Sequence, residues 1–292
     1  MIGPEPSMIP LALQIESAVT QDGMHANVDA TIARGYVPFT GYLDSRKGAV
    51  HICGGGPSLA ETWQDIPEGE DIFAINSAIG YLIRAGRAPR YAMIWDASEV
   101  CEAFAVPHPD VTYLIAARCH PKVFERLSDC RVVVWYAGGD HDIMDFMRER
   151  KIAEPAIFGG SAGVTRGLFV AYAMGWREIH LHGADSSFQQ DDRTHVDGAS
   201  LVAEKRLPVH VCGRDFLTTP ELCGQVEEIK LIYPMFTTAH MGASITAHGD
   251  GMLPHIVRYM AQNPLEAAAT AIESLIDKAT PKTLQPLEGV PA

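Results

Sequence analysis

The chain has 292 residues, of which 47% are hydrophobic and 20% charged, and its formal net charge is −13 with the histidines neutral. This balance is typical of a globular protein with a sizeable core, and the negative charge argues against general binding to nucleic acid or to an anionic membrane. The length fits one large α/β domain with additions, or two smaller domains.

The first 48 residues are predicted to form a helical lead-in, with helices over 9–19 and 25–36. Gly35 is the expected end of the second helix, because glycine readily adopts the left-handed conformation that closes a helix. No apolar run is long enough to span a bilayer, and the start MIGPEPSMIP lacks the cationic residues of a signal peptide. We therefore expect a soluble, cytoplasmic protein.

From residue 49 the pattern alternates between apolar strands and amphipathic helices. Strands are predicted over 49–53, 71–76, 90–97, 111–117, 131–137, 155–160 and 177–185, and helices over 58–66, 78–86, 121–129, 141–150 and 161–175. Such alternation predicts an α/β fold, a Rossmann-like and mostly parallel sheet with helices on both faces.

A polar loop over 186–200 then interrupts the alternation, and polar loops of this kind often carry function. A strand over 206–214, a helix over 218–236, a strand over 243–250 and closing helices over 252–264 and 264–279 are predicted next. The Pro-rich tail over 280–292 lacks apolar periodicity and is predicted to be disordered. The predicted division is a lead-in over 1–48, a nucleotide-binding domain over 49–262, and a C-terminal helix and tail over 263–292.

The six cysteines form no C-x-x-C pair. In a long chain without a secretion signal, reduced and buried thiols are expected in place of a disulfide framework.

The segment VHICGGGPSL is the most informative motif, because a strand runs directly into three glycines, a proline and a serine. Glycines allow the backbone to approach an anion closely, and the helix that follows offers unpaired N–H groups. The predicted phosphate-contacting residues here are Gly54, Gly55, Gly56 and Ser58. A tight structural turn explains the same residues equally well.

Other predicted strand ends also carry polar groups. Asn76 and Ser77 follow the second strand and Asp96 follows the third, so in a parallel sheet they lie at the edge where ligands collect. Asn76 and Asp96 fit equally well as caps of the helices that follow them. Their joint placement with the glycine loop favours a ligand site.

A second glycine loop, IFGGSAGVTRG, again leads from a strand into a helix. Ser161 is the expected N-cap, and Gly160 and Gly163 permit close approach of an anion. The spacing is not G-x-G-x-x-G, which argues against a nicotinamide cofactor, and no G-x-x-x-x-G-K-[ST] motif is present.

The third motif is HLHGADSSFQQDDRTHVD. Asp185 ends a strand and His195 lies in the polar loop, where a histidine can accept a proton from a hydroxyl near neutral pH. A transition-metal site of His180, His182, Asp185 and His195 is disfavoured, since that strand is expected to be packed on both faces. Carboxylates such as Asp96 and Asp185 suit Mg²⁺ better.

Together, GGGPSL, DIFAINSAIGYLIRAGRAPRYAMIWDAS and GGSAGVTRGLFVAYAMGWREIHLHGADSSF resemble the 6-hydroxymethylpterin diphosphokinase MptE-like family, over about residues 28–255. That family includes the catalytic domain of the motility-accessory-factor flagellin glycosyltransferases. Its skeleton also resembles that of small bacterial sialyltransferases that use CMP-sialic acid.

The resemblance implies a transferase that grips a nucleotide. It implies that Gly54, Gly56 and Ser58 approach the phosphate or ribose, that Asn76 donates to a phosphate oxygen, and that Ser161 and Gly163 hold the nucleotide from the opposite side. His195 matches the position of the general base of the sialyltransferases. The paired tyrosines of those enzymes have no clear equivalent, Tyr136 being only a candidate.

Three functions remain open at this point. The first is glycosyl transfer from a CMP-type nucleotide sugar to an unidentified acceptor hydroxyl, with His195 as base and Asp185 as a second catalytic group. The second is Mg²⁺-dependent diphosphate transfer from ATP to a pterin-like acceptor, which needs Asp96 or Asp185 and is disfavoured by the scarcity of Lys and Arg in the glycine loops. The third is a non-catalytic nucleotide-binding module, and a homo-oligomer is compatible with all three.

Overall fold

The computed structural model describes residues 19–139, 141–189, 193–196 and 206–279. The helix predicted over 9–19 lies almost wholly outside these residues, and the predicted tail over 280–292 lies outside them entirely. None of the described helices is long and apolar enough to cross a membrane.

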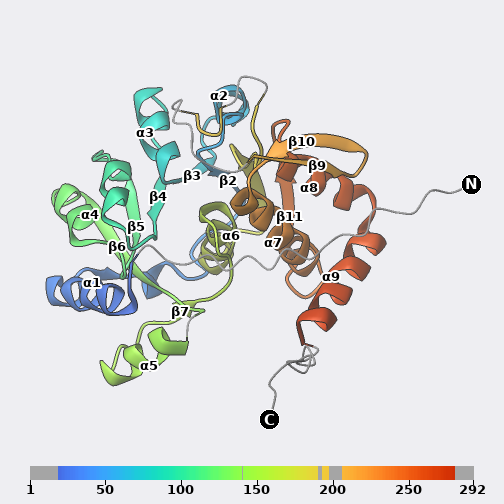
Figure 1. Cartoon of the computed structure of the whole chain (residues 1–292). Coiled ribbons are helices and arrows are strands. Elements are labelled where there is room, and N and C mark those ends of the chain that lie inside the picture. The colour runs from blue at the N-terminus through green and yellow to red at the C-terminus, as the bar shows by residue number, and fades with distance from the viewer. Residues whose placement is uncertain (1–18, 140, 190–192, 197–205, 280–292) are drawn as a thin grey trace, which may run out of the picture.

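A parallel sheet forms the centre of the molecule (Figure 1). Its strand order is β1-β6-β5-β4-β3-β2-β8-β11, with β7 beside β6, and every described pair in it is parallel. The strands are β1 (Val37–Pro38), β2 (Ala49–Cys53), β3 (Asp71–Ile75), β4 (Tyr91–Ile94), β5 (Thr112–Ala116), β6 (Arg131–Ala137), β7 (Ala156–Ile157), β8 (Glu178–His182) and β11 (Ser244–Ala247).

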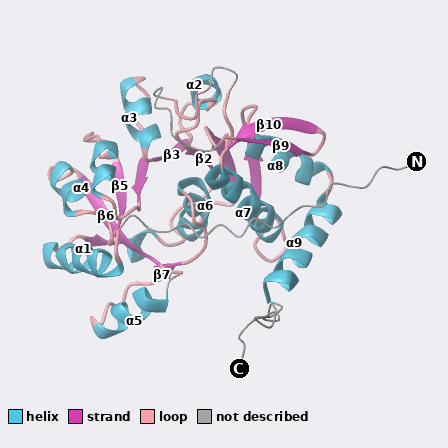
Figure 2. Ribbon diagram, in the orientation of Figure 1, coloured by secondary structure: helices cyan, strands magenta, loops and turns pink. Residues whose placement is uncertain are grey.

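Helices surround this sheet, and Figure 2 shows α6 and α7 in front of it with α8 and α9 beside them. Helix α6 packs against β2 and β3, whereas α8 packs against β11. The helices are α1 (Gln21–Arg34), α2 (Leu59–Thr62), α3 (Ser77–Arg84), α4 (Pro121–Arg126), α5 (His141–Glu149), α6 (Gly163–Met174), α7 (Pro220–Phe236), α8 (Met252–Gln262) and α9 (Pro264–Ala279), with 3-10 turns η1 (Phe39–Tyr42), η2 (Trp63–Asp65) and η3 (Glu99–Phe104).

The predicted Rossmann-like α/β architecture is confirmed. Strands β2 to β6 are nearly continuous apolar runs because both faces of a parallel sheet are covered, and Ile52, Phe73 and Trp135 are fully buried. Gly35 ends α1 in the left-handed conformation, as predicted, with φ of 66°.

The lead-in is not purely helical, because β1 joins the sheet beside β6. The predicted helix over 58–66 is also shorter, since α2 gives way to the 3-10 turn η2 at Trp63.

The strand predicted over 206–214 is wrong in extent. The chain forms an antiparallel hairpin of β9 (Leu207–Val211) and β10 (Arg214–Thr218), and α7 begins only at Pro220. The turn is made by Cys212 and Gly213, whose φ angles of 48° and 77° are both positive. Two positive φ angles match the tight turn that suits the strand twist, but cysteine is an unusual residue for it. Cys212 is exposed there, contrary to the prediction of buried thiols.

Candidate functional site

The candidate site lies where the strand order reverses. The chain leaves β2 toward β3 and later returns to β8 on the other side of β2, so the loops that follow β2 and β8 meet at this point. The Gly54 N–H donates to the His182 carbonyl and the Gly56 N–H to the Gly183 carbonyl, both at 2.8 Å. These bonds fix the first glycine loop against the end of β8.

A cavity of about 170 Å³ opens at this crevice. Many of its lining residues come from the predicted site: Gly54, Gly55, Gly56, Asn76, Ser77, Gly163, Asp185 and His195. The others are Ile75, Phe104, Val164, Gly183, Ala184, Ser186, Ser187, Thr194, Leu222 and Gln225. The structure therefore brings together motifs that are up to about 140 positions apart in the chain.

Close approach explains the glycines of the first loop. A Cβ on Gly55 would lie 1.9 Å from the Ser77 hydroxyl oxygen, and a Cβ on Gly56 would lie 2.3 Å from Asp185 Oδ2. Both separations are shorter than a contact with a Cβ allows. Ser77 and Asp185 can therefore approach the loop backbone this closely only because these two residues are glycines.

Asn76 occupies a strained turn between β3 and α3. Its φ of 51° and ψ of −120° lie outside the regions that a residue with a Cβ normally adopts. Its side chain makes no capping bond to α3, and its buried Oδ1 has no hydrogen-bond partner among the described residues. Because strained residues cluster at functional sites, Asn76 is the best-supported ligand contact of the predicted set.

Replacing Asn76 with glycine is expected to separate stability from binding. Relief of the strain should raise the free energy of unfolding by about 1 kcal/mol, whereas loss of the amide should weaken nucleotide binding about tenfold or more. Chemical unfolding and calorimetric titration measure the two quantities. Asn263→Gly is the matched control, because Asn263 has a negative φ of −127° and glycine there should only lower stability. A destabilised Asn76→Gly protein would contradict the assignment of strain.

Asp185 is buried behind the first glycine loop and lines the cavity. Its Oδ2 accepts the Ser58 N–H at 3.0 Å, while its buried Oδ1 has no hydrogen-bond partner in the part of the chain that the structure describes. Burial raises the pKa of this carboxyl above its ordinary value, against the hydrogen bonds from Ser58 that favour the charged form. Ser58 itself is buried and does not line the cavity, so its structural role is to tie the loop to Asp185.

His195 faces the glycine loop from the described segment 193–196. The Val196 N–H donates to the Gly55 carbonyl at 2.8 Å, which ties this segment to the loop. The imidazole Nδ1 lies 3.1 Å from the Thr194 hydroxyl, and a Cβ on Gly55 would be 3.7 Å from the ring carbon Cδ2. The imidazole is therefore beside the cavity with its Nδ1 engaged, whereas Nε2 has no hydrogen-bond partner among the described residues.

The start of α6 differs from the prediction. The N-cap is Ala162, not Ser161, and neither Gly160 nor Ser161 lines the cavity. The Glu228 carboxylate of α7 accepts the Ser161 N–H at 2.7 Å, the Ser161 hydroxyl at 3.1 Å and the Thr165 hydroxyl at 2.5 Å. The Glu228 carboxylate thus accepts the hydrogen bonds that we expected Ser161 to donate to a nucleotide. Of Gly160, Ser161 and Gly163, only Gly163 lines the cavity.

Asp96 also lies apart from the cavity. It is exposed, and its Oδ1 accepts the Ser98 N–H at 2.7 Å, so it shapes the turn before η3, whose N-cap is Ser98 and not Asp96. Asp96 and Asp185 therefore do not line the cavity together. Among the described residues, no group of three or more His, Cys, Asp or Glu side chains is arranged to hold a metal ion. The residues present do not fit a magnesium ion held by this carboxylate pair.

No Lys or Arg stands among the described residues that line the cavity. Arg90 pairs with Asp71, and the buried Arg166 donates to the carbonyls of Gly138 and Ile157. An anion in the cavity would depend on backbone N–H groups, hydroxyls and His195.

Three of the lining residues were not predicted from the sequence, because no local motif marks them. Leu222 and Gln225 come from α7, and Phe104 comes from the end of η3. The Ser186 hydroxyl lies 3.1 Å from Gln225 Oε1, which joins the loop after β8 to α7.

Comparison with solved structures gives the same fold. A MAf glycosyltransferase from Magnetospirillum magneticum AMB-1 aligns with a TM-score of 0.57 and 16% identity, covering 81% of this chain. The chain spans only 38% of that protein's length. The sialyltransferase CstII from Campylobacter jejuni aligns more weakly, with a TM-score of 0.34, 17% identity, and coverage of 69% of this chain and 80% of its own. No curated protein matches the chain.

The family model for 6-hydroxymethylpterin diphosphokinase MptE-like proteins matches residues 27–191, which include both glycine loops, Asn76 and Asp185. This match confirms the resemblance predicted from the motifs and covers more than half of the chain. The chain belongs to the 6-hydroxymethylpterin diphosphokinase MptE-like family, a family of transferases.

Proposed function

We propose that the chain is a nucleotide-dependent transferase that moves a glycosyl group from a CMP-type nucleotide sugar to an acceptor hydroxyl. The observation that carries this proposal is the lining of the cavity, which combines His195 and backbone N–H donors with no described Lys or Arg. Such a lining suits the single phosphate of a nucleoside monophosphate better than a triphosphate, whose larger charge requires cations.

In this proposal His195 Nε2 removes the proton from the acceptor hydroxyl. The acceptor oxygen forms a bond to the anomeric carbon, and the bond from that carbon to the phosphate oxygen breaks. The electron pair leaves with the nucleoside monophosphate. The Gly55 N–H and the N–H groups at the start of α3 stabilise the charge on the departing phosphate, because the N–H groups of Gly54, Gly56 and Ser58 already donate within the protein.

In this proposal both side-chain atoms of Asn76, the unpartnered oxygen and the amide nitrogen, make hydrogen bonds to the nucleotide. A buried oxygen without a donor is unfavourable until a ligand supplies one, and a ribose hydroxyl is such a donor. We therefore assign Asn76 to both a phosphate oxygen and a hydroxyl of the nucleotide. Asp185 supports the loop through Ser58, and it is the second acid–base group of the cavity.

The second candidate function is diphosphate transfer from ATP, which is favoured by the description of the family itself. In that reaction Asp185, with its unpartnered Oδ1, is the described carboxylate that reaches the cavity. Mg²⁺ would then have to arrive with the ATP phosphates, because the described residues that line the cavity include one carboxylate and not a pair.

Calorimetric titration with CMP, CDP, ATP and AMP, each with and without Mg²⁺, tests the two functions against each other. We expect metal-independent binding of CMP that is lost in Asn76→Ala. Preference for ATP that requires Mg²⁺ would overturn glycosyl transfer in favour of the diphosphokinase. Failure of all four nucleotides to bind would leave the glycine loops as structural turns.

A further inference from the structure

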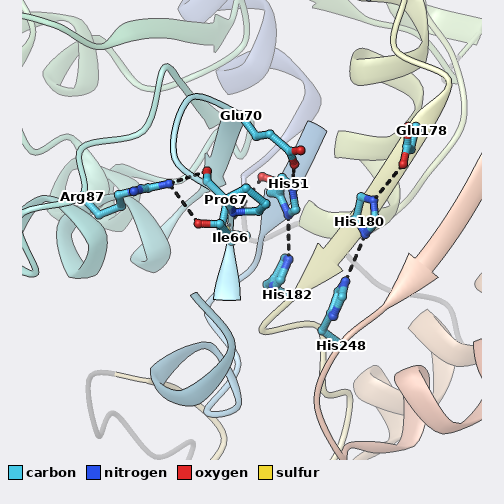
Figure 3. A network of polar contacts seen from close by, with 10 residues as sticks. His51, Ile66, Pro67, Glu70, Arg87, Glu178, His180, His182 and His248 are labelled. Carbon is cyan, nitrogen blue, oxygen red and sulfur yellow. Dashed lines mark hydrogen bonds and ion pairs between the residues drawn. The ribbon is translucent and has the colours of Figure 1, made fainter. Parts of the chain in front are cut away.

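Four histidines meet on one face of the sheet, close to the candidate site but outside its cavity. His51 on β2 and His180 on β8 are paired in register, and His182 and His248 lie next to them, from the end of β8 and just after β11. Figure 3 shows the four rings packed together, and we call them the histidine quartet. The function proposed above does not use them.

Two nitrogen–nitrogen contacts join the quartet in pairs. His51 Nδ1 lies 3.0 Å from His182 Nε2, and His180 Nδ1 lies 3.1 Å from His248 Nε2. The pairs stack on each other, with ring centroids 4.8 Å apart for His51 and His180 and 4.3 Å apart for His182 and His248. Each contact needs one N–H and one lone pair. Full protonation would turn both contacts into opposed N–H groups.

The surroundings offer the quartet limited charge compensation. Glu70 Oε2 contacts His51 Nε2, and Glu178 Oε1 lies 3.5 Å from His180 Nε2 (Figure 3). Asp65 of η2 and Arg258 of α8 also act on His248, with opposite effects on its charge. Among the described residues, His182 has no acidic side chain in contact with it, and its buried Nδ1 has no hydrogen-bond partner.

Burial is the main reason why His51, His182 and His248 resist protonation. It lowers the pKa of His182 to about 3, with further lowering by the other three rings. Burial also lowers the pKa of His51, although Glu70 opposes this, and the pKa of His248. A histidine with a lowered pKa in the folded state stabilises the fold fully above its unfolded pKa of about 6.5, and that stability is lost as the pH falls below this value.

The quartet is connected to the first glycine loop through α2. The main chain of Thr62, at the end of α2, lies against His182, and the Thr62 N–H bonds to the Ser58 carbonyl one turn earlier. At the start of α2, the Ser58 N–H is held by Asp185, three residues after His182. Movement of β8 or α2 away from the quartet would therefore loosen residues 54–62.

We propose that the histidine quartet is a proton-binding site that controls whether the glycine loop and α2 stay closed against the end of β8, at the edge of the candidate nucleotide cavity. The closed arrangement requires neutral imidazoles. Opening gives them access to water, so protons favour the open arrangement. The effect on nucleotide affinity rests on the proposed function, whereas the effect on loop opening does not.

Hydrogen exchange of the Gly54, Gly56, Ser58 and Thr62 amides between pH 5 and pH 8 tests the proposal, after correction for intrinsic exchange rates and with a chelator present. Each histidine that must stay neutral should reduce protection about tenfold per pH unit below about pH 6.5. His248→Gln removes one of these groups from a half-buried position. Protection in His248→Gln should therefore fall less steeply than in the wild type, and the two slopes should differ by about tenfold per pH unit.

His210→Gln is the matched control, because His210 is exposed on the hairpin and contacts only Asp215 among the described acidic residues. Its pH dependence should equal that of the wild type. Asp185 and His195 are present in all three proteins, so neither contributes to the difference between slopes. Circular dichroism at pH 8 confirms that each variant is folded, and His182→Gln is a second variant with the same expectation.

Protection that is constant from pH 5 to pH 8 in the wild type would overturn the proposal, as would equal slopes for His248→Gln and the wild type. Titration with CMP at pH 8 and pH 5.5 is a separate measurement. A larger loss of CMP affinity from pH 8 to pH 5.5 in the wild type than in His248→Gln supports control of nucleotide binding by the quartet. Absence of CMP binding at pH 8 overturns the proposed function alone, because hydrogen exchange still decides the role of the quartet.

Discussion

Replacement of His195 with alanine is expected to lower kcat/KM for transfer by about 10²- to 10⁴-fold, the usual contribution of a positioned general base. The imidazole lies beside the glycine loop, with Nδ1 near the Thr194 hydroxyl and Nε2 available to the acceptor. Release of CMP from CMP-sialic acid, with and without a panel of hydroxyl acceptors, measures the loss.

Nucleotide affinity should be nearly unchanged in His195→Ala, because the glycine loop and Asn76 remain in place. Added imidazole should restore part of the activity, since it can enter the space left by the side chain, and restoration distinguishes a catalytic base from a structural residue. His240→Ala, at an exposed position, is the control with expected full activity. Equal activity of His195→Ala and the wild type would remove the base from the proposed mechanism.

The core of the fold was predictable because local sequence determines it. Strands covered on both faces are apolar along most of their length, and the runs at 49–53, 111–117 and 131–137 met this condition apart from His51 and the polar residues at their starts. The glycine loop and Asn76 were predictable for a related reason. In a parallel sheet all strands end at one edge, so polar residues at several strand ends converge without knowledge of the strand order.

The wrong predictions involve contacts between distant residues. Ser161 was expected to meet a nucleotide, but Glu228 lies 67 positions later on α7 and takes its donors. Nothing local in either segment indicates that contact. The β9–β10 hairpin was missed because its turn contains Cys212 at positive φ, a position where Asn, Asp or Gly gives the usual signal.

The histidine quartet was only partly visible in the sequence. The alternation of His180 and His182 placed them on one face of a strand, but His51 lies 129 positions before His180, and His248, just after β11, lies 68 positions after it. Their approach depends on the order β2-β8-β11, which a single sequence does not reveal. Strand order, more than strand identity, is what the sequence left undetermined.

Replacement of Gly56 with alanine is expected to destabilise the fold by about 1–3 kcal/mol, the usual range for overpacking a filled site, and to abolish measurable nucleotide binding. A Cβ there would lie 2.3 Å from Asp185 Oδ2 and 2.7 Å from the Gly183 carbonyl oxygen. The carbonyl belongs to the backbone and cannot rotate away, so the glycine loop must shift from β8. That shift also breaks the bond from the Gly56 N–H to Gly183.

Chemical unfolding and titration with CMP measure the two effects, and Gly41→Ala is the matched control. A Cβ on Gly41 would meet nothing within 4 Å, so the stability and affinity of Gly41→Ala should equal those of the wild type.

The losses of stability and of nucleotide binding in Gly56→Ala need not have one cause, because a less stable protein can still bind. Titration is therefore done at a temperature where both proteins are folded. Wild-type affinity in folded Gly56→Ala would show that this loop does not contact the nucleotide, and the candidate site would then reduce to Asn76, Ser77 and His195.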